Sequence, residues 1–377
     1  MLRESLMMTN IPDSYENSRD RFRAALAAAR DLWPAARLSS HTLTRDPSLT
    51  IDWISANAAK KKEKLFILTT GEHGVEGYVG SAMMQLFIEE FLPRLDPQTT
   101  GLLLVHAINP WGMKHRRRVN ADNVDLNRSF VRDLSALADF NPGYARIDSF
   151  LNPQSPIKSV ALSKIGFGLR MPSLLRRFGV KRFREAALMG QYRQPRGLYY
   201  GGEEPPEETR TVIALYRQYA LRYKRILHLD MHTGYGPRYQ MTLVNSAREK
   251  MSSQETEDRF GVARVAAIDP DEFYSIQGDL TDYLYDLAGE EFPEKRLYSA
   301  AFEFGTFGES LSAAVRSMRT MIFENRLHWH GGSGRARKWI EAEFLEFYAP
   351  SEPAWFEKAK ADARQTFEGI LKAEGYL

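Results

Sequence analysis

The chain of 377 residues is long enough for one large α/β domain with insertions or for two domains of average size. Its 43% hydrophobic and 26% charged residues are those of an ordinary globular protein, which excludes a disordered, collagen-like or coiled-coil chain. The net charge of +3 is small and indicates no nucleic-acid partner, while the absence of cysteine excludes disulfides, thiolate metal ligands and thiol nucleophiles.

The first half of the chain predicts an alternation of helices and strands. Apolar residues at helical spacing, short apolar runs and turn residues mark the boundaries. In chain order we expect a helix over Tyr15–Trp33, strands around 41–44 and 49–54, a buried strand over Lys64–Thr70, a helix over 78–91 and a buried strand over Gly101–Ile108.

The second half continues this alternation with several strands close together. The expected elements are helix 207–222, strands 225–231, 240–245, 263–268 and 299–304, and helices 311–326, 335–347 and 354–373. This order predicts a three-layer α/β/α fold with a mixed, mostly parallel sheet, in which the neighbouring strands of the second half pair partly antiparallel. We expect a single catalytic domain over 1–377, with an insertion at about 131–206 that carries short basic helices, and a C-terminal helical segment at about 335–377.

No targeting or membrane segment is recognisable. The N-terminal residues lack the apolar core of a signal peptide, and no run of about eighteen apolar residues occurs. We therefore expect a cytoplasmic, bacterial protein without a membrane partner, and the sequence does not indicate its oligomeric state.

Polar clusters follow three of the predicted strands. The first is the glycine-rich GEHGVEG, in which His73 and Glu76 stand three residues apart. Glycines let the backbone fold tightly, so that both side chains can reach one point, and imidazole nitrogen with carboxylate oxygen suits zinc. A surface turn is the alternative, because an isolated H-x-x-E is common.

The second cluster ends the strand RILHLDMHTGYG. Alternation along a strand places His228, Asp230 and His232 on one face. A core histidine held by a carboxylate is the better interpretation for His228, whereas His232 stands at the strand end like a ligand. Two histidines and one glutamate would leave a fourth coordination position open, as in catalytic zinc sites.

The third cluster contains Glu303, an acid inside the apolar strand AFEFG. Burial raises the pKa of a carboxyl group, which would suit a general base beside a metal. A structural salt bridge explains the same residue equally well.

An arginine run, Arg116–Arg118, follows the turn Asn-Pro-Trp-Gly and precedes the phrase VDLNRSF. Guanidinium groups bind carboxylates in a bidentate manner, so this run could recognise a substrate carboxylate. The alternatives are a solvated basic loop, or an RNA-binding patch formed together with the basic segment KRFREA.

Taken in order, these motifs resemble the zinc carboxypeptidase superfamily, which includes the succinylglutamate desuccinylase and aspartoacylase branch. The order is H-x-x-E, N-P-x-G, an arginine, V-D-L-N-R-S-F, a histidine that ends a strand and a glutamate within a strand, and it spans His73 to Glu303. The phrases GEHGVEG, LDMHTGYG and GLYYGG further resemble a bacterial subfamily of carboxypeptidase-like or deacylase-like proteins.

The resemblance implies a role for each matching residue. It makes His73, Glu76 and His232 the ligands of one Zn²⁺ ion and Glu303 the base that activates the zinc-bound water; Asp125 holds the free nitrogen of the first histidine, Asn127 and Arg128 grip the substrate carboxylate with Arg118 nearby, and Arg117 stabilises the oxyanion. The register of the arginine run is open, so Arg116 or Arg118 could take the place of Arg117.

The chain departs from the carboxypeptidase pattern in two ways. No motif selects a substrate-capping tyrosine, for which Tyr235, Tyr239 and Tyr274 are all candidates. The insertion is larger than a plain carboxypeptidase needs, and its aromatic and basic residues could roof the cleft and narrow the substrate range.

The expected function is hydrolysis of an amide bond next to a free carboxylate, carboxypeptidase-like on small peptides. An N-acyl amino acid deacylase is the alternative enzyme, and a metal-dependent carboxylate-binding protein without turnover is the alternative of another class. Zinc is favoured by the resemblance, although two histidines and one carboxylate also suit iron.

Overall fold

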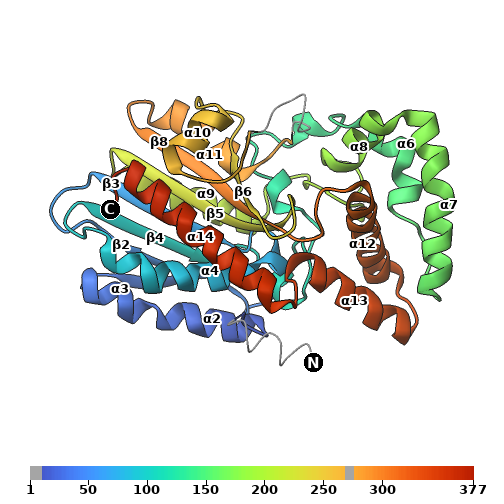
Figure 1. Cartoon of the computed structure of the whole chain (residues 1–377), viewed down its shortest axis with the longest axis horizontal. Coiled ribbons are helices and arrows are strands. Elements are labelled where there is room, and N and C mark those ends of the chain that lie inside the picture. The colour runs from blue at the N-terminus through green and yellow to red at the C-terminus, as the bar shows by residue number, and fades with distance from the viewer. Residues whose placement is uncertain (1–10, 268–275) are drawn as a thin grey trace.

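The computed structural model describes residues 11–267 and 276–377, and its centre is an eight-stranded sheet (Figure 1). The strand order is β1-β2-β4-β3-β5-β8-β6-β7. The strands are β1 (Arg37–Thr42), β2 (Thr50–Ala56), β3 (Lys64–Thr70), β4 (Thr100–His106), β5 (Arg225–Gly234), β6 (Met241–Asn245), β7 (Val265–Ala267) and β8 (Arg296–Gly305).

The middle of the sheet is parallel and its edges are mixed. Strands β4, β3, β5 and β8 run in one direction, while β2 pairs antiparallel with both β1 and β4. On the other edge, β6 pairs antiparallel with β8 and parallel with β7. The sheet is therefore mixed and mostly parallel, as predicted, and the antiparallel pairing expected in the second half is the contact between β6 and β8.

Helices cover both faces of the sheet. Phe66 of β3 stacks on Phe87 of α4, and Phe302 of β8 contacts Phe367 of α14, which marks one face. On the other face α9 packs against β5 and α11 against β8 through hydrogen bonds and aromatic contacts. The helices of these layers are α2 (Tyr15–Ala24), α3 (Leu26–Leu32), α4 (Gly77–Glu90), α9 (Glu207–Ala220), α11 (Leu280–Glu291) and α14 (Pro353–Ala373). The predicted three-layer α/β/α fold class is confirmed.

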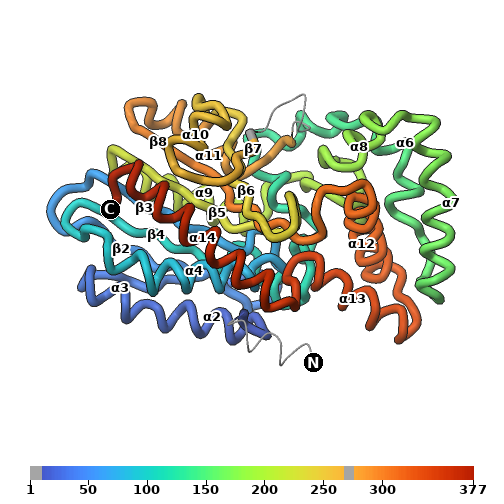
Figure 2. The backbone as a smooth tube through the Cα atoms, viewed as in Figure 1, coloured from blue at the N-terminus to red at the C-terminus, as the bar shows by residue number. Residues whose placement is uncertain are grey.

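The residues 131–206 form a helical group at one end of the molecule. This group contains α6 (Pro142–Leu151), α7 (Val160–Phe178) and α8 (Val180–Leu188), and it lies next to α12 (Leu311–His330) and α13 (Gly334–Tyr348) (Figure 2). The expectation of short helices here was wrong for α7, which runs for 19 residues. Ser159 caps its start by accepting a hydrogen bond from Leu162 N, and Gly179, with φ of 78°, ends it.

The remaining differences from the predicted elements are small. The first predicted helix is divided into α2 and α3 at Ala25, and α10 (Ser253–Phe260) and α11 were not predicted. Ile268, the end of one predicted strand, lies outside the described residues. Among the helices that the structure describes, none is both long and apolar enough to span a membrane.

Candidate metal centre

The carboxyl ends of the parallel strands bring the predicted site residues together. β3 is followed by His73 and Glu76, while His232 and Glu303 are paired neighbours on β5 and β8. Loops that follow adjacent parallel strands meet at one edge of a sheet, and ligands commonly bind there. Residues far apart in the sequence thus form one site.

A close backbone contact fixes the loop that carries His73 and Glu76. A Cβ atom on Gly74 would lie only 2.1 Å from the carbonyl carbon of Gly112, so this position requires glycine. Gly74 N donates to Arg118 O at 3.0 Å, and Val75 N donates to Arg117 O at 2.9 Å. The loop after β3 is therefore bound to the arginine loop that follows β4.

Each histidine is oriented by a buried carboxylate on its Nε2 atom. His73 Nε2 lies 3.1 Å from Asp125 Oδ1, and His232 Nε2 lies 2.7 Å from Asp230 Oδ2. Such partners fix the ring orientation and the tautomer of histidines that bind metals. Asp125 was predicted in this position from the family pattern, whereas Asp230 was predicted only to share the face of His232.

The other ring nitrogens both face Glu76. His73 Nδ1 lies 2.9 Å from Glu76 Oε1, and His232 Nδ1 lies 3.2 Å from Glu76 Oε2. These separations are close to the distance of about 3.3 Å between two ligands of tetrahedral zinc, given bonds of about 2.0–2.1 Å. His73 Nδ1 is buried, and its contact with Glu76 does not have hydrogen-bond geometry. With Nε2 facing Asp125, Nδ1 is the nitrogen that a metal could share with Glu76.

Glu72 is an additional carboxylate that the sequence analysis missed. Its side chain is buried, and neither of its oxygens has a hydrogen-bond partner among the described residues. Ligand atoms of Glu72, His73 and His232 all lie within 4.8 Å of one another, so this group could hold a metal ion. Burial raises the pKa of Glu72 well above its usual value, and a bound cation would relieve this. The sequence signal was present, because Glu72 directly precedes His73.

Arg118 balances the negative charge of the centre. Arg118 Nε donates to Asp125 Oδ2 at 2.9 Å, and its Nη1 donates to Glu76 Oε1 at 3.1 Å. Burial would raise the pKa of Asp125, but the charges of Arg118 and His73 outweigh it and hold that pKa well below its usual value. Asp125 therefore stays ionised and accepts hydrogen bonds from both neighbours.

Glu303 lies beside the histidines with a raised proton affinity. Its Oε1 accepts a hydrogen bond from Tyr235 N at 2.9 Å. Burial, reinforced by the charge of Glu76, raises the pKa of Glu303 to about 7. No salt bridge holds this carboxylate among the described residues, in contrast to the structural alternative that the sequence left open.

Arg117 does not reach the metal centre, contrary to its predicted place there. Its Nε donates to Glu324 Oε1 at 2.7 Å, and its Nη2 lies within hydrogen-bond distance of Asn123 and Asn325. Consecutive residues of the loop point in different directions, so Arg118 occupies the position expected for Arg117. Within the arginine run, Arg118 is therefore the residue that contacts Glu76.

Asn127 and Arg128 lie beside Asp125, and hydrogen bonds to backbone groups occupy part of each side chain. Asn127 Oδ1 accepts a hydrogen bond from Leu280 N at the start of α11, at 3.0 Å. Arg128 donates to the carbonyl oxygens of Asn127 and Leu188, while its buried Nε has no hydrogen-bond partner. The side-chain amide of Asn127 and Arg128 Nε remain the groups that could meet a ligand.

The insertion contributes an aromatic side chain to this region. The guanidinium carbons of Arg118 and Arg128 lie 5.8 and 5.6 Å from the ring centroid of Tyr199. Tyr199 has φ of 55°, an uncommon backbone conformation for a tyrosine that is often retained at functional sites. Among the predicted capping residues, the phenol of Tyr239 bonds to Glu352, Tyr235 supplies a backbone donor to Glu303, and Tyr274 lies outside the described residues.

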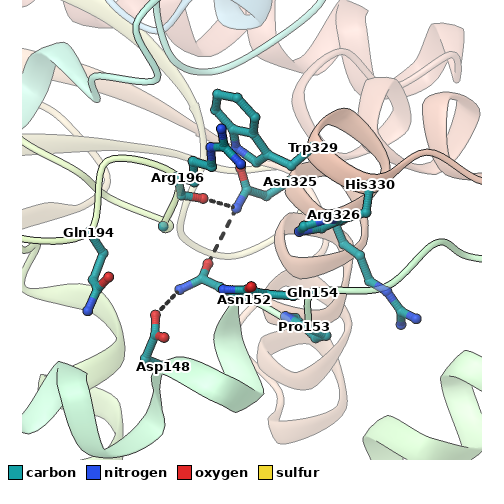
Figure 3. Close-up of a pocket in the computed structure, with 11 residues that line it drawn as sticks. Asp148, Asn152, Pro153, Gln154, Gln194, Arg196, Asn325, Arg326, Trp329 and His330 are labelled. Carbon is teal, nitrogen blue, oxygen red and sulfur yellow. Dashed lines mark hydrogen bonds between the residues drawn. The ribbon is translucent and has the colours of Figure 1, made fainter.

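A separate cavity of about 70 Å³ lies between the insertion and α12 (Figure 3). Asn325 and Asn152 connect its two sides, because Asn325 Nδ2 donates to Arg196 O at 2.8 Å and to Asn152 Oδ1 at 3.3 Å. None of the predicted site residues lines it. The Arg196 guanidinium instead lies over the Trp329 ring, at 4.9 Å from its centroid.

A family described as "Protein of unknown function (DUF2817)" matches residues 12–362. The chain belongs to this family. No curated protein matches this DUF2817 chain.

Solved structures with a similar fold include several carboxypeptidases. Bovine thrombin-activatable fibrinolysis inhibitor, in complex with tick carboxypeptidase inhibitor, is 12% identical over 87% of this chain and 95% of its own, with a TM-score of 0.44. Carboxypeptidase A from Helicoverpa armigera is 13% identical over 88% and 73%, with a TM-score of 0.45. A metallo-carboxypeptidase from Pseudomonas aeruginosa is 15% identical over 82% and 68%, with a TM-score of 0.41.

Proposed function

We propose that this protein is a metal-dependent hydrolase that cleaves an amide bond next to a free carboxylate in small peptides, in the manner of a carboxypeptidase. One observation carries the proposal. The Nδ1 atoms of two buried histidines face one carboxylate, Glu76, while a carboxylate with a raised pKa, Glu303, stands on the neighbouring strand. A structural ion pair would not need this last group.

In this proposal, His73, His232 and Glu76 hold one Zn²⁺ ion. Glu76 is favoured over Glu72 because Glu72 approaches His232 from its Nε2 side, at 3.4 Å, where Asp230 is already bound. Zinc held by two histidines and one carboxylate polarises a substrate carbonyl and lowers the pKa of water. The histidines must be neutral to bind it, so metal binding would release the proton that the raised pKa of His232 retains.

Glu303 is the proposed general base and then the general acid. A carboxylate with a pKa near neutrality can accept a proton from water and return it to the leaving amine. The hydrogen bond from Tyr235 N to Oε1 orients the group, and Oε2 is the atom that would exchange the proton. A bound cation would lower the pKa of Glu303 from the value near 7.

Arginines would recognise the negative charges of the substrate. Arg118 is held beside the histidines by Asp125 and Glu76, and we assign it the charge that develops on the carbonyl oxygen. Arg128 Nε and the amide of Asn127 are assigned to the terminal carboxylate. Tyr199, which packs against both arginines, would form the wall between these two subsites.

A matched substrate panel tests the proposal. Purified protein with Zn²⁺ would be incubated with dipeptides, the same dipeptides amidated at the C-terminus, and N-acyl amino acids. We expect cleavage of the free dipeptides, loss of activity on the amides and loss of activity after chelation. Turnover of N-acyl amino acids alone would move the assignment to a deacylase, and equal turnover of the amides would contradict the carboxylate requirement.

A further inference from the structure

The insertion carries a concentration of positive charge that the catalytic centre does not use. Residues 158–184 contain eight basic residues and no aspartate or glutamate. The net charge of +3 for the whole chain therefore combines +8 in this segment with −5 elsewhere. The basic residues are Lys158, Lys164, Arg170, Arg176, Arg177, Lys181, Arg182 and Arg184.

Most of these cations are exposed and unneutralised. In the part of the chain that the structure describes, no acidic side chain pairs with Arg176, Arg177 or Lys181, and each of the three is exposed. Elsewhere on the surface, exposed arginines do have acidic partners, such as Arg364 with Glu90. This local excess of charge would attract an anionic partner.

The same segment also exposes large aliphatic side chains. Leu162, Ile165 and Leu169 of α7 are 70%, 57% and 75% exposed, and Val180 at the start of α8 is 63% exposed. Their spacing of three and four residues places the three α7 side chains along one face of the helix. Three other exposed large hydrophobics, Leu221, Tyr239 and Leu311, are scattered over the rest of the described chain.

The opposite face of α7 is anchored to the protein. Phe167 and Met171 are buried, and Phe167 stacks on Phe150 of α6 with ring centroids 5.2 Å apart. Lys164 lies over the Trp339 ring of α13, at 4.0 Å from its centroid. The outward face is thus held in place on the outermost helix at this end of the molecule (Figure 1).

We propose that α7 and the start of α8 form a docking surface for an anionic lipid bilayer. A fixed helix with aliphatic side chains pointing outward and several lysines and arginines beside them has the properties of an interfacial membrane-binding helix. The aliphatic side chains would enter the boundary between headgroups and acyl chains, and the cations would contact lipid phosphates. This departs from the expectation, drawn from the sequence, of no membrane partner.

Two other occupants fit the surface less well. A second copy of the chain would bring two segments of charge +8 together, which opposes pairing along the aliphatic face. Proteins that bind single-stranded nucleic acid add aromatic side chains that stack on bases to their cations, but the outward hydrophobic residues here are aliphatic, and Phe167 and Phe183 are buried.

Vesicle flotation tests the proposal with the full chain. The probes are vesicles of phosphatidylcholine alone and vesicles that also contain phosphatidylglycerol. We expect binding to the anionic vesicles only, and weaker binding as salt is added. Replacing Leu162, Ile165 and Leu169 by serine should reduce the partition coefficient at least tenfold, because aliphatic burial is lost, while the melting temperature is retained.

The contribution of the cations to vesicle binding is tested with a matched control. Changing Arg176, Arg177 and Lys181 to glutamine should weaken vesicle binding at least tenfold. The same three-charge removal at Lys60, Lys61 and Lys62, exposed residues of the loop between β2 and β3, should leave binding unchanged, as should Leu311→Ser. Absence of binding to anionic vesicles would overturn the proposal. So would an equal loss of vesicle binding in the Arg176/Arg177/Lys181 variant and the Lys60/Lys61/Lys62 variant, or a dimer that the serine variant dissociates.

Discussion

The site at the carboxyl ends of the parallel strands and the insertion differ in how their charged residues are arranged. Where the parallel strands end, buried carboxylates, two histidines and Arg118 form a network of close contacts, in which Glu72 and His73 Nδ1 make ion-pair contacts but no hydrogen bond. In residues 158–184, exposed cations of one sign stand side by side with no aspartate or glutamate between them. The first arrangement suits a cation held inside the protein, and the second suits an anionic surface outside it.

Two histidines of β5 show how neighbouring groups set the charge of a buried side chain. His228 and His232 share one face of the strand, yet the ring nitrogens of His228 bond to hydroxyl groups of Thr69, Tyr216 and Ser299. Burial lowers the pKa of His228 to about 4, so it stays neutral in the core. His232 is buried too, but Asp230 and Glu76 raise its pKa well above the usual range. Neighbours, and not burial alone, thus decide the charge of each histidine. Hydroxyl groups occupy both ring nitrogens of His228, whereas Nδ1 of His232 faces Glu76.

The largest expected effect comes from the carboxylate with the raised pKa. Glu303→Gln should lower kcat by about 10³-fold, within the range for general acid–base groups, while the zinc content is unchanged. Steady-state kinetics and metal analysis on the same preparation measure both. Glu309→Gln, on an exposed residue after β8, is the control, and a Glu303→Gln variant of full activity would remove Glu303 from the mechanism.

Substituting the two neighbouring arginines should affect different properties of the protein. Arg118→Ala should lower kcat/KM by about 10²-fold, because a donor beside the histidines is lost. Arg117→Ala should instead leave Glu324 without its partner and reduce the free energy of unfolding by about 3 kcal/mol. Denaturant titration and kinetics separate the two outcomes. A catalytic defect in Arg117→Ala, in protein that remains folded, would restore the original assignment of Arg117.

A smaller effect is expected from the carboxylates that orient the histidines. Asp230→Asn should weaken zinc affinity by about 10- to 100-fold, because the ring of His232 loses the partner that fixes its tautomer. Competition with a chelator of known affinity gives the value. Asp52→Asn removes a buried carboxylate that pairs with Arg23, far from the site in the sheet order, and should leave zinc affinity unchanged.

A further effect concerns the pH dependence of stability in the metal-free protein. Because folding raises the pKa of Glu303 to about 7, from an ordinary 4.5, the folded protein binds this proton more tightly than the unfolded chain does. The contribution to stability is present at low pH and is lost as pH rises through about 7. Unfolding of wild type and Glu303→Gln, compared between pH 5 and pH 8, should show this difference. A difference of the opposite sign would contradict the burial of the carboxyl form.

Much of the fold followed from local sequence patterns. The apolar run Lys64–Thr70 was predicted with its observed bounds, because a strand buried on both faces is uniformly apolar and a glycine ends it. Helix α11 was not predicted, although Leu280, Leu284 and Leu287 have helical spacing and Asp279 caps its start. In α7, Gly166, Gly168 and Pro172 weaken the helical pattern, and packing against α6, α8 and α13 supports the full length of the helix.

The site was harder to predict from the sequence than the fold. The strand ends and the family pattern predicted that His73, Glu76, His232 and Glu303 lie close together. The structure places them at the carboxyl ends of the parallel strands, and their roles remain predictions. The choice between Arg117 and Arg118 depended on the direction of each side chain in a loop without periodicity. Glu72 has no counterpart in the motif, and its lack of hydrogen bonds becomes visible only in the folded structure.

Metal content shows whether His73, His232 and Glu76 hold a catalytic ion. Zinc per chain would be measured after purification of wild type, Glu76→Ala and Glu72→Ala under identical conditions. We expect one zinc ion per chain in wild type and in Glu72→Ala, and loss of zinc in Glu76→Ala. Wild type without metal, or zinc lost from Glu72→Ala but kept by Glu76→Ala, would contradict this assignment.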